Sequence, residues 1–419
     1  MEGNRKFFAR KHPTCQRGLL CAEAWAEDWV SAERADDEEW DWVESARFSG
    51  AVTGMAPALL SAPRVRSMAR LHFHDTFGDD PAAPTRLAGL RFLRMSIHGA
   101  NAQRFADDFR PGLQELELWV GGGGARNPEL FSSAGVAALR GLALIGGSVY
   151  DDQAITLSRM AFRRLEISAH RLSEAGLAAL GNLPLRRLRL VNAGLGAAAI
   201  PILARTGCGA TLEELRIWGW MQEPPSAVRA RMPRLRRLAL PHCNLGPDAI
   251  GSLDIAPLDE LDLSDNALGT RGIAALGDPG PSILKLASCG LDDEAAARLA
   301  AWPGLARVRY LDLIGNSIGK SGAAALCASQ HLGALEALGI SRNHTLGASG
   351  VEILLAGWGG GLRWLAAEGC APPDEMVEAL IRQRPPGLRD LRLGDHAIML
   401  LRGATMARLR AALPGCAIG

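Results

Sequence analysis

Three stretches of the chain carry residue types that could do chemistry, and the first imitates a nucleotide site. The stretch "GNSIGKSGAAAL" (315–326) contains Gly319-Lys320-Ser321, the end of a phosphate-binding loop. That loop requires GxxxxGK[S/T], with four residues between the glycines, so that successive backbone N–H groups wrap a phosphate. Only three residues separate Gly315 from Gly319. We therefore interpret Lys320 as a solvent-facing residue where a helix begins.

The second and third stretches could bind a metal ion or a phosphate. "LHFHD" (71–75) places His72 and His74 two residues apart beside Asp75, and two imidazoles on one strand face can reach one zinc ion. The spacing fixes no third ligand, although His98 is expected one strand away. "VGGGGA" (120–125) has no Lys-Ser/Thr after it and is interpreted as an insertion. We predict no metal and no cofactor.

Other features point away from catalysis, nucleic acid and membranes. The chain has no GxSxG, no HExxH and no distinct carboxylate pair, so we predict that it is not an enzyme. Its net charge of +1 supplies no long-range field for nucleic acid. No apolar run approaches the ~20 residues of a membrane span. The eight cysteines are dispersed without a CxxC pair, which favours free thiols in a reducing compartment. We predict a cytoplasmic monomer.

A repeat of 23 to 27 residues organises most of the chain. Self-similarity at such a period indicates stacked supersecondary units. The segments "LDELDLSDNAL" (258–268) and "VRYLDLIGNSI" (308–318) share the template LxxLxLxxNxL. Thirteen copies begin at residues 90, 113, 139, 162, 185, 212, 235, 258, 281, 308, 335, 362 and 388.

The template predicts a strand, a turn and a short helix in each copy. Position 4 is Leu in all thirteen copies, and position 6 is apolar throughout. This spacing turns both side chains to one strand face and leaves positions 3, 5 and 7 on the other. After the strand, segments such as "GTRGIAALGD" place apolar residues at helical spacing. Because one unit cannot bury its own apolar side, we predict a stacked α/β solenoid.

These residues resemble the leucine-rich repeat family, and the helix-bearing turns are similar to its ribonuclease-inhibitor-like class. The resemblance covers about residues 90 to 410. It implies a horseshoe with a concave parallel sheet and convex short helices. Family members place Asn or Cys at position 9, where the side chain fills hydrogen bonds of the turning backbone. This chain has Asn266, Asn316, Asn343, Cys243, Cys289 and Cys370 there, with His98, His170 and His396 in three other copies.

The sequence predicts four segments. Residues 1–45 are expected to form an acidic, Trp-rich helical cap, because residues 23–44 hold ten acidic residues and one Arg, and a terminal repeat needs a polar cover. Within this segment, "EDWVSAERAD" resembles the short domain that precedes leucine-rich repeats in some large bacterial families. Residues 46–89 are expected to hold one or two degenerate repeats, residues 90–408 the regular solenoid, and residues 409–419 a C-terminal cap.

The exposed strand face is the predicted binding surface. Equal template positions on neighbouring parallel strands lie about 4.8 Å apart, so the central repeats gather arginines, and Trp occurs at position 7, where polar residues are usual. Trp, Tyr and Arg are common interface anchors. In an alternative interpretation, the arginines pair with carboxylates across strands and the aromatic rings stack on one another. We predict that a protein partner contacts Trp119, Arg164, Arg187, Arg189, Arg216, Trp218, Arg237, Tyr310 and Trp364.

The function predicted from the sequence is that of a non-catalytic interaction scaffold, with a protein partner on the concave face and a regulatory or inhibitory role. The alternative is a GTPase-activating or other enzyme-regulating protein, because some leucine-rich repeat proteins place an arginine or asparagine on the horseshoe for that purpose. A metal-dependent enzyme is the distant alternative. The scaffold fixes the fold, while its variable surface residues set specificity.

Overall fold

The computed structural model describes residues 14–16, 19–25, 45–49, 60, 69–73, 83–109, 112–121, 128–169, 171–191, 199–219, 232–251, 253, 258–358, 360–401 and 403–419. The chain forms two compact units. Unit 1 comprises Met1–Val191 and Thr206–Cys208, and unit 2 comprises Asn192–Arg205 and Gly209–Gly419.

Unit 1 contains a parallel sheet whose strands follow one another in chain order. A short antiparallel strand, β1, pairs with β2 at one edge, and β2 to β9 then pair in parallel. The strands are β1 (Thr14–Gln16), β2 (Leu19–Trp25), β3 (Ser45–Ser49), β4 (Arg70–Phe73), β5 (Phe92–His98), β6 (Glu115–Gly121), β7 (Gly141–Ser148), β8 (Arg164–Ser168) and β9 (Arg187–Val191). The connecting helices are the 3-10 helix η2 (Ala83–Arg86), α5 (Gly99–Asp108), α6 (Pro128–Ser132), α7 (Ala134–Ala137), α8 (Asp151–Leu157) and α9 (Glu174–Leu180).

Unit 2 repeats the same arrangement with shorter strands. Parallel pairing joins β10 to β18 in chain order. The strands are β10 (Glu214–Trp218), β11 (Arg237–Ala239), β12 (Glu260–Asp262), β13 (Ile283–Lys285), β14 (Tyr310–Asp312), β15 (Ala337–Gly339), β16 (Trp364–Ala366), β17 (Asp390–Arg392) and β18 (Ala417–Ile418). The helices are α10 (Ala199–Arg205), α12 (Pro247–Gly251), α13 (Gly269–Ala274), α14 (Asp293–Ala301), α15 (Lys320–Cys327), α16 (Gly347–Trp358), α17 (Pro373–Gln383), α18 (Asp395–Leu400) and α19 (Gly403–Ala412), with 3-10 turns η5 (Gly207–Ala210), η6 (Pro303–Arg307) and η7 (Leu332–Ala334).

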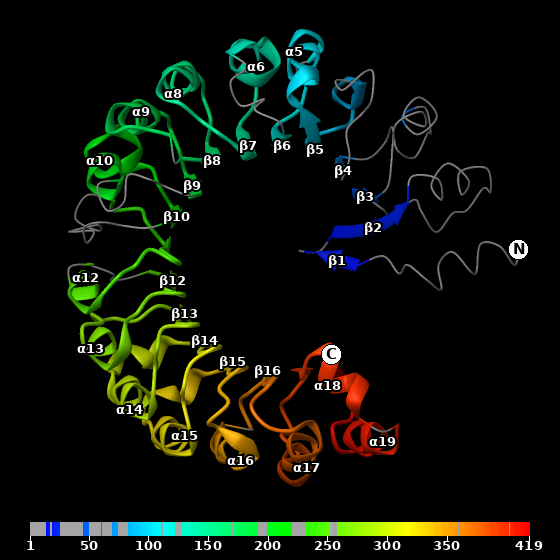
Figure 1. Ribbon diagram of the computed structural model, residues 1–419, viewed down its shortest axis with the longest axis vertical. Coiled ribbons are helices and arrows are strands. Elements are labelled where there is room, and N and C mark those ends of the chain that lie inside the picture. The colour runs from blue at the N-terminus through cyan, green and yellow to red at the C-terminus, as the bar shows by residue number, and fades with distance from the viewer. Residues whose placement is uncertain are drawn as a thin grey trace, which may run out of the picture. The chain divides into compact units, whose positions relative to one another are not determined.

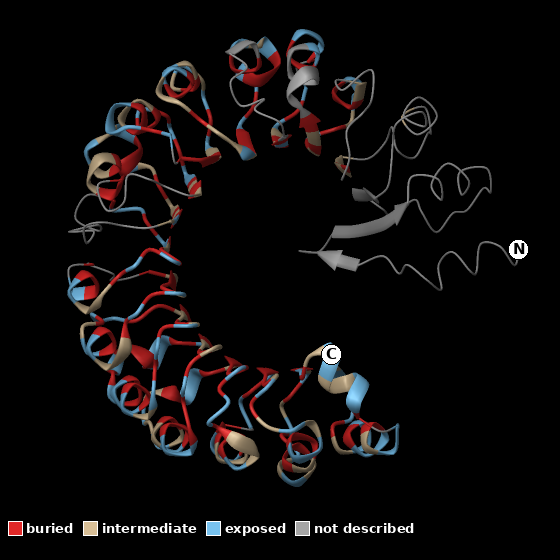
Figure 2. Cartoon of the chain, in the orientation of Figure 1, coloured by how far each residue is buried: buried red, intermediate tan, exposed pale blue. Residues whose placement is uncertain are grey.

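The repeat template sets the register of the sheet in both units. Leu311, at position 4 of its copy, pairs with Leu284 on one side and Leu338 on the other, so each leucine stacks on the leucine of the next repeat. Every position-4 leucine from Leu93 to Leu391 is at most 1% exposed. Within each unit the helices lie on one side of the strands (Figure 1), and buried residues occur on both the strands and the helices (Figure 2). The predicted α/β solenoid core is confirmed, with about 1.5 to 3 kcal/mol for each buried leucine.

Buried asparagine side chains connect the turns of neighbouring repeats in unit 2 by hydrogen bonds. Asn316 Oδ1 accepts hydrogen bonds from the backbone N–H groups of Cys289 and Leu291, both at 3.0 Å. Its Nδ2 donates to the carbonyl oxygens of Leu286 and Leu313, both at 2.9 Å. Asn266 makes the same four kinds of bond. Asn343 accepts from the Ile318 N–H and donates to the carbonyl oxygens of Leu313 and Ile340. The expected role of asparagine at position 9 is confirmed.

Cysteine at position 9 makes one of the bonds that asparagine makes. The Sγ atom of Cys289 donates to the carbonyl oxygen of Leu263 at 3.2 Å, and Cys243 and Cys370 donate in the same way to Ile217 and Ile340. All three thiols are buried. Burial raises the pKa of Cys243 and Cys289 to about 12 and that of Cys370 to about 11. These thiols are therefore structural groups.

The first 45 residues differ from the predicted helical cap. Residues 14–16 and 19–25 are strands, so the helical prediction is wrong there, and residues 26–44 lie outside the described part of the chain. In β2, Ala22 pairs with Ala46 and Ala24 with Phe48, which places these residues at positions 4 and 6 of the template. Strands β3 and β4 lie in the region where one or two degenerate repeats were predicted, and β2 adds a further strand in template register within the predicted cap. The antiparallel β1 covers the edge that β2 would otherwise expose.

The other chain end also extends the sheet. Residues 403–412 form a helix, α19, and Ala417 and Ile418 continue past Pro414-Gly415 as β18, which pairs in parallel with β17. A strand therefore covers the last full repeat as well. Among the described residues, no helix has the length and apolar character needed to cross a membrane.

Candidate functional site

The strand face opposite the helices carries the variable side chains of each unit. Along β8 and β10, partly exposed residues at positions 3 and 5 alternate with fully buried residues at positions 4 and 6. This alternation follows the pleat of a strand that packs on one side only. The predicted orientation of positions 3 and 5 is thus confirmed on these strands. Phe92 is an exception at position 3, because it is only 7% exposed.

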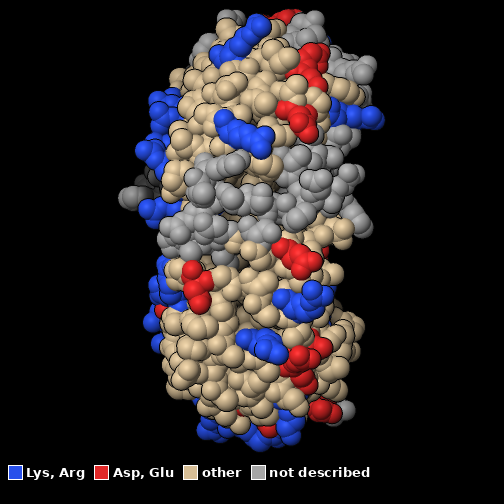
Figure 3. All heavy atoms as spheres, turned by 90° about the vertical axis from the view of Figure 1, so that its left-hand side faces the viewer, with Lys and Arg blue, Asp and Glu red and all other residues tan. Residues whose placement is uncertain are grey.

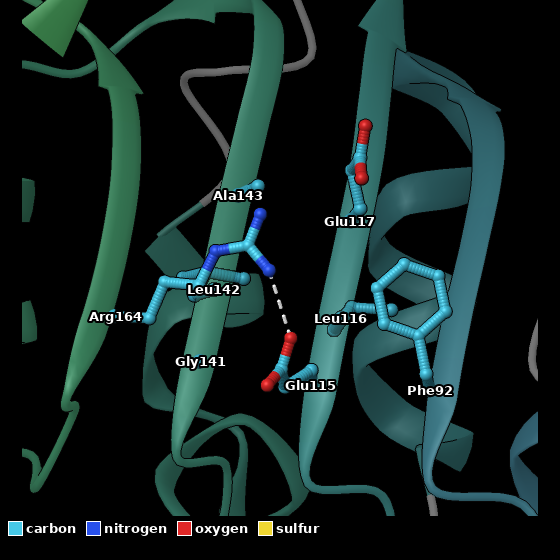
Figure 4. Close-up of a pocket in the computed structure, with 8 residues that line it drawn as sticks. All are labelled: Phe92, Glu115, Leu116, Glu117, Gly141, Leu142, Ala143 and Arg164. Carbon is cyan, nitrogen blue, oxygen red and sulfur yellow. Dashed lines mark hydrogen bonds and ion pairs between the residues drawn. The ribbon is translucent and has the colours of Figure 1, made fainter. Parts of the chain in front are cut away.

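In unit 1, two small residues on β7 open a shallow hollow in this face. Gly141 and Ala143 form its floor, and Glu115 and Glu117 on β6 stand on one side of it (Figure 4). Arg164 on β8 reaches over Gly141, and its Nη1 lies 2.9 Å from Glu115 Oε2. A Cβ atom at residue 141 would lie 3.1 Å from the Glu115 side chain. The glycine therefore lets two side chains that are two strands apart pair directly.

The neighbouring charges of unit 1 are paired in the same way. Arg94 Nε lies 3.3 Å from Glu117 Oε1, and Arg189 Nη1 lies 3.2 Å from both carboxylate oxygens of Glu166. Burial raises the pKa of Glu117, against the opposing effect of the Arg94 charge. Of the predicted contact residues in this unit, Arg189 is therefore held by a carboxylate on the adjacent strand, and Arg164 by one two strands away.

Trp119, on β6, remains open to solvent at position 7. Its side chain is 43% exposed, and the Arg94 guanidinium carbon lies 5.7 Å from the ring centroid. Such a contact is compatible with a cation–π interaction. The ring is thus supported on one side by a cation and leaves its remaining surface accessible.

In unit 2, the charged side chains also pair between strands. Arg237 Nη1 lies 3.5 Å from Glu214 Oε2, and Arg216 Nη2 lies 3.8 Å from Asp262 Oδ2 across the small Ala239. These two pairs, Arg237 with Glu214 and Arg216 with Asp262, agree with the alternative interpretation, in which arginines pair with carboxylates across strands. The order of charges along the template was enough to find them.

The aromatic residues of unit 2 lie in two places on the strand face. Trp218 on β10 is 41% exposed, with the His242 ring centroid 6.1 Å away. Tyr310 on β14 and Trp364 on β16 meet over Ala337 of β15, with ring centroids 5.7 Å apart. The stacking alternative therefore describes Tyr310 and Trp364, whereas Trp218 keeps a large accessible surface.

Acidic groups surround the Tyr310 end of this aromatic pair. Burial, together with the negative charges of Asp312, Asp262 and Glu260, raises the pKa of Tyr310 to about 12. Burial also raises the pKa of Asp312, whose carboxylate accepts a hydrogen bond from the Ile314 N–H. Lys285 forms an ion pair with Glu260 on the adjacent strand. This part of the face is aromatic and acidic, in contrast to the arginine-rich face of unit 1.

The motifs that imitated ligand sites have structural roles where they are described. The Gly319 N–H donates to Asp293 Oδ1 at 2.6 Å, and the Gly322 N–H donates to the same oxygen. A carboxylate thus occupies the position that a phosphate would need, and Lys320 is exposed at the start of α15, as predicted. The His72 ring stacks near Phe92 with centroids 5.0 Å apart, while His74 lies outside the described residues. The part of the chain that the structure describes contains no group of three potential metal ligands.

These stacked strand–turn–helix units, with one buried and one variable strand face, define an α/β repeat protein. The family profile described as Leucine Rich repeat matches residues 256–277 and 308–327. The chain is a leucine-rich repeat protein. No curated protein matches it.

Solved structures with similar folds share little sequence with the chain. A chain of the Rad7 and Elc1 complex in yeast is 15% identical, with a TM-score of 0.49, covering 94% of this chain and 88% of that one. A chain of the TLR13–ssRNA13 complex is 17% identical, with a TM-score of 0.40 and coverages of 84% and 51%. An internalin (inlF) from Listeria monocytogenes str. 4b F2365 is 14% identical, with a TM-score of 0.37 and coverages of 82% and 87%.

Proposed function

We propose that this protein is a non-catalytic scaffold that binds a protein partner on the exposed strand face of its repeats, with a regulatory or inhibitory role in the cytoplasm. The observation that carries the proposal is the exposure of two tryptophans, Trp119 at 43% and Trp218 at 41%, on a face where polar residues are usual. Large apolar groups that remain open to solvent mark interaction surfaces, and tryptophan is among the commonest anchors of such interfaces.

The paired charges around these tryptophans support the proposal. Each of Arg164, Arg189, Arg216 and Arg237 has a carboxylate neighbour on the same face. Such pairs hold the long side chains in place before a partner arrives, which lowers the entropy lost on binding. A partner that covers Trp119 or Trp218 would meet a polar rim whose hydrogen bonds are already arranged.

Affinity capture followed by mass spectrometry tests the proposal. The wild-type chain is compared with W119A, W218A and the double variant, and with I155A as control. Ile155 is 47% exposed but lies on helix α8, so its replacement removes exposed apolar surface away from the strand face. Loss of an anchor costs about 2 kcal/mol or more, so we expect captured proteins to be lost with the tryptophan variants and kept with I155A. An unchanged set of proteins with the double variant would refute the proposal.

For the asparagines of the turns, the hydrogen bonds favour a scaffold over the alternative of GTPase activation. An activating residue must present its donor groups to the bound nucleotide. The side-chain amides of the turn asparagines already bond to backbone atoms through both their oxygen and their nitrogen. This holds for Asn266, Asn316 and Asn343. A GTP hydrolysis assay with a captured GTPase separates the two functions, because a scaffold leaves the rate unchanged.

A further inference from the structure

A row of arginines lies along one rim of unit 1. Template position 2 directly precedes each strand. The backbone N–H of a position-2 residue donates to the backbone carbonyl of the position-2 residue in the preceding repeat. The Arg140 N–H donates to the Gln114 carbonyl at 2.8 Å, and the Arg163 and Arg186 N–H groups donate to the carbonyls of Arg140 and Arg163. Neighbours therefore lie one strand spacing, about 4.8 Å, apart. From β5 to β9 the row reads Arg91, Gln114, Arg140, Arg163 and Arg186.

The charges of this row are exposed and of one sign. All four arginines are exposed, and no carboxylate occupies position 2 from β5 to β9. Among the described residues, no ion pair joins Arg91, Arg140 or Arg163 to an acidic side chain, and Glu115, the residue after Gln114, pairs with Arg164 instead. Figure 3 shows basic side chains along the left-hand edge of the view, in both its upper and its lower part, with most acidic ones farther to the right. Like charges on adjacent strands repel each other.

The same row in unit 2 shows that the template does not require arginine. Arg236 Nη1 lies 3.5 Å from Asp259 Oδ2, and Arg309 forms an ion pair with Glu336. Position 2 there includes three carboxylates and one serine, and reads Glu213, Arg236, Asp259, Ser282, Arg309, Glu336, Arg363 and Arg389. The packing of a repeat therefore does not account for the row of like charges in unit 1.

We propose that the arginine row of unit 1 (Arg91, Arg140, Arg163 and Arg186) is a docking surface for an acidic segment of a protein partner. Guanidinium groups form paired hydrogen bonds to carboxylates, and an extended acidic segment that runs across the strands places successive carboxylates along the row. Position 2 holds no aromatic residue from β5 to β9, whereas single-stranded nucleic acid is bound on aromatic platforms between basic groups. The row is distinct from the strand face proposed above, so either surface can fail its test alone.

Binding of a fluorescein-labelled oligoglutamate peptide to the full chain, measured by fluorescence anisotropy at low ionic strength, tests the proposal. The variant R140E/R163E reverses two charges of the row. The control R363E/R389E reverses two exposed arginines at the same template position in unit 2, and so makes the same change in net charge. We expect about tenfold weaker binding or more for R140E/R163E, and wild-type binding within about twofold for the control. Binding should weaken as salt is added, because salt screens exposed charges.

Circular dichroism and thermal unfolding establish that each variant is folded. The variant R140Q/R163Q removes the two charges without reversing them and should bind the peptide with intermediate affinity.

Three results would overturn the proposal. In the first, the wild-type chain fails to bind oligoglutamate. In the second, the two charge-reversal variants lose affinity equally, which would mean that only net charge matters. In the third, an oligothymidylate of equal charge binds more tightly than the peptide and loses affinity with R140E/R163E, which would identify the row as a nucleic-acid surface.

Discussion

Asn316 offers the sharpest test of how the turns hold neighbouring repeats together. Its side chain bonds four buried backbone groups, the N–H groups of Cys289 and Leu291 and the carbonyls of Leu286 and Leu313. Asn316→Ala leaves all four without this partner. At a net value of about 0.5 to 1.5 kcal/mol for each hydrogen bond, we expect a loss of roughly 2 to 6 kcal/mol in the free energy of unfolding. Ser317→Ala is the control, because Ser317 is the exposed neighbour and should change that free energy by no more than about 0.5 kcal/mol.

Two measurements check this prediction. Urea unfolding followed by circular dichroism gives the free energy, and native-state hydrogen exchange reports the local effect. The amides of Cys289 and Leu291 should exchange faster in Asn316→Ala, because their acceptor has been removed, and should be unchanged in Ser317→Ala. If Asn316→Ala lost less than about 1 kcal/mol and left both amides protected, the turn asparagine would not carry the role assigned to it.

Three further predictions follow from the buried and capping groups. With pKa values of about 12, 12 and 11, the thiols of Cys243, Cys289 and Cys370 should resist alkylation at neutral pH in the native protein and react in urea. Mass spectrometry of the alkylated peptides checks this, and native labelling of Cys289 would contradict it. In Tyr150→Phe, which leaves one of the two tyrosines, the tyrosinate absorbance of Tyr310 should appear near pH 12. Because this folded-state pKa lies above the ordinary value of about 10, its contribution to stability is complete below pH ~10 and is lost as the pH rises through ~12; a midpoint near the ordinary value would show that the phenol is not buried among carboxylates. Asp292 caps α14 by accepting a hydrogen bond from the Ala295 N–H at 2.9 Å, so Asp292→Ala should cost about 1 kcal/mol in thermal unfolding, whereas Asp292→Ser should keep most of the cap.

The regular repeats are the part of the fold that could be predicted from the sequence, because each copy of the template has the same pattern as the next. Leu261, Leu284 and Leu311 recur at one position of a fixed period, and stacking puts each of them in the core. The strand β2 could not be found in this way. Ala22 and Ala24 occupy positions 4 and 6 of its register, but alanine does not stand out from surface residues as leucine does. The acidic residues nearby instead predict a helical cap over residues 1–45.

The candidate site was predicted in outline, because its face follows from strand alternation. Its partners were predicted only where opposite charges alternate at one template position, as for Arg237 and Glu214. The Arg164 contact with Glu115 was not found, since these residues lie on strands that are not adjacent and Gly141 must leave room between them.

The sequence by itself determined the repeat, the buried leucines and the asparagine turns, because each depends on the local alternation of apolar and polar residues and recurs with the period. Only the tertiary structure decided which exposed groups are already engaged. Tyr310 and Trp364 meet over Ala337, whereas Trp119 and Trp218 keep about two fifths of their surface open. That difference depends on the size of the side chain on the intervening strand and on the conformations of its neighbours, which the period of the sequence does not specify.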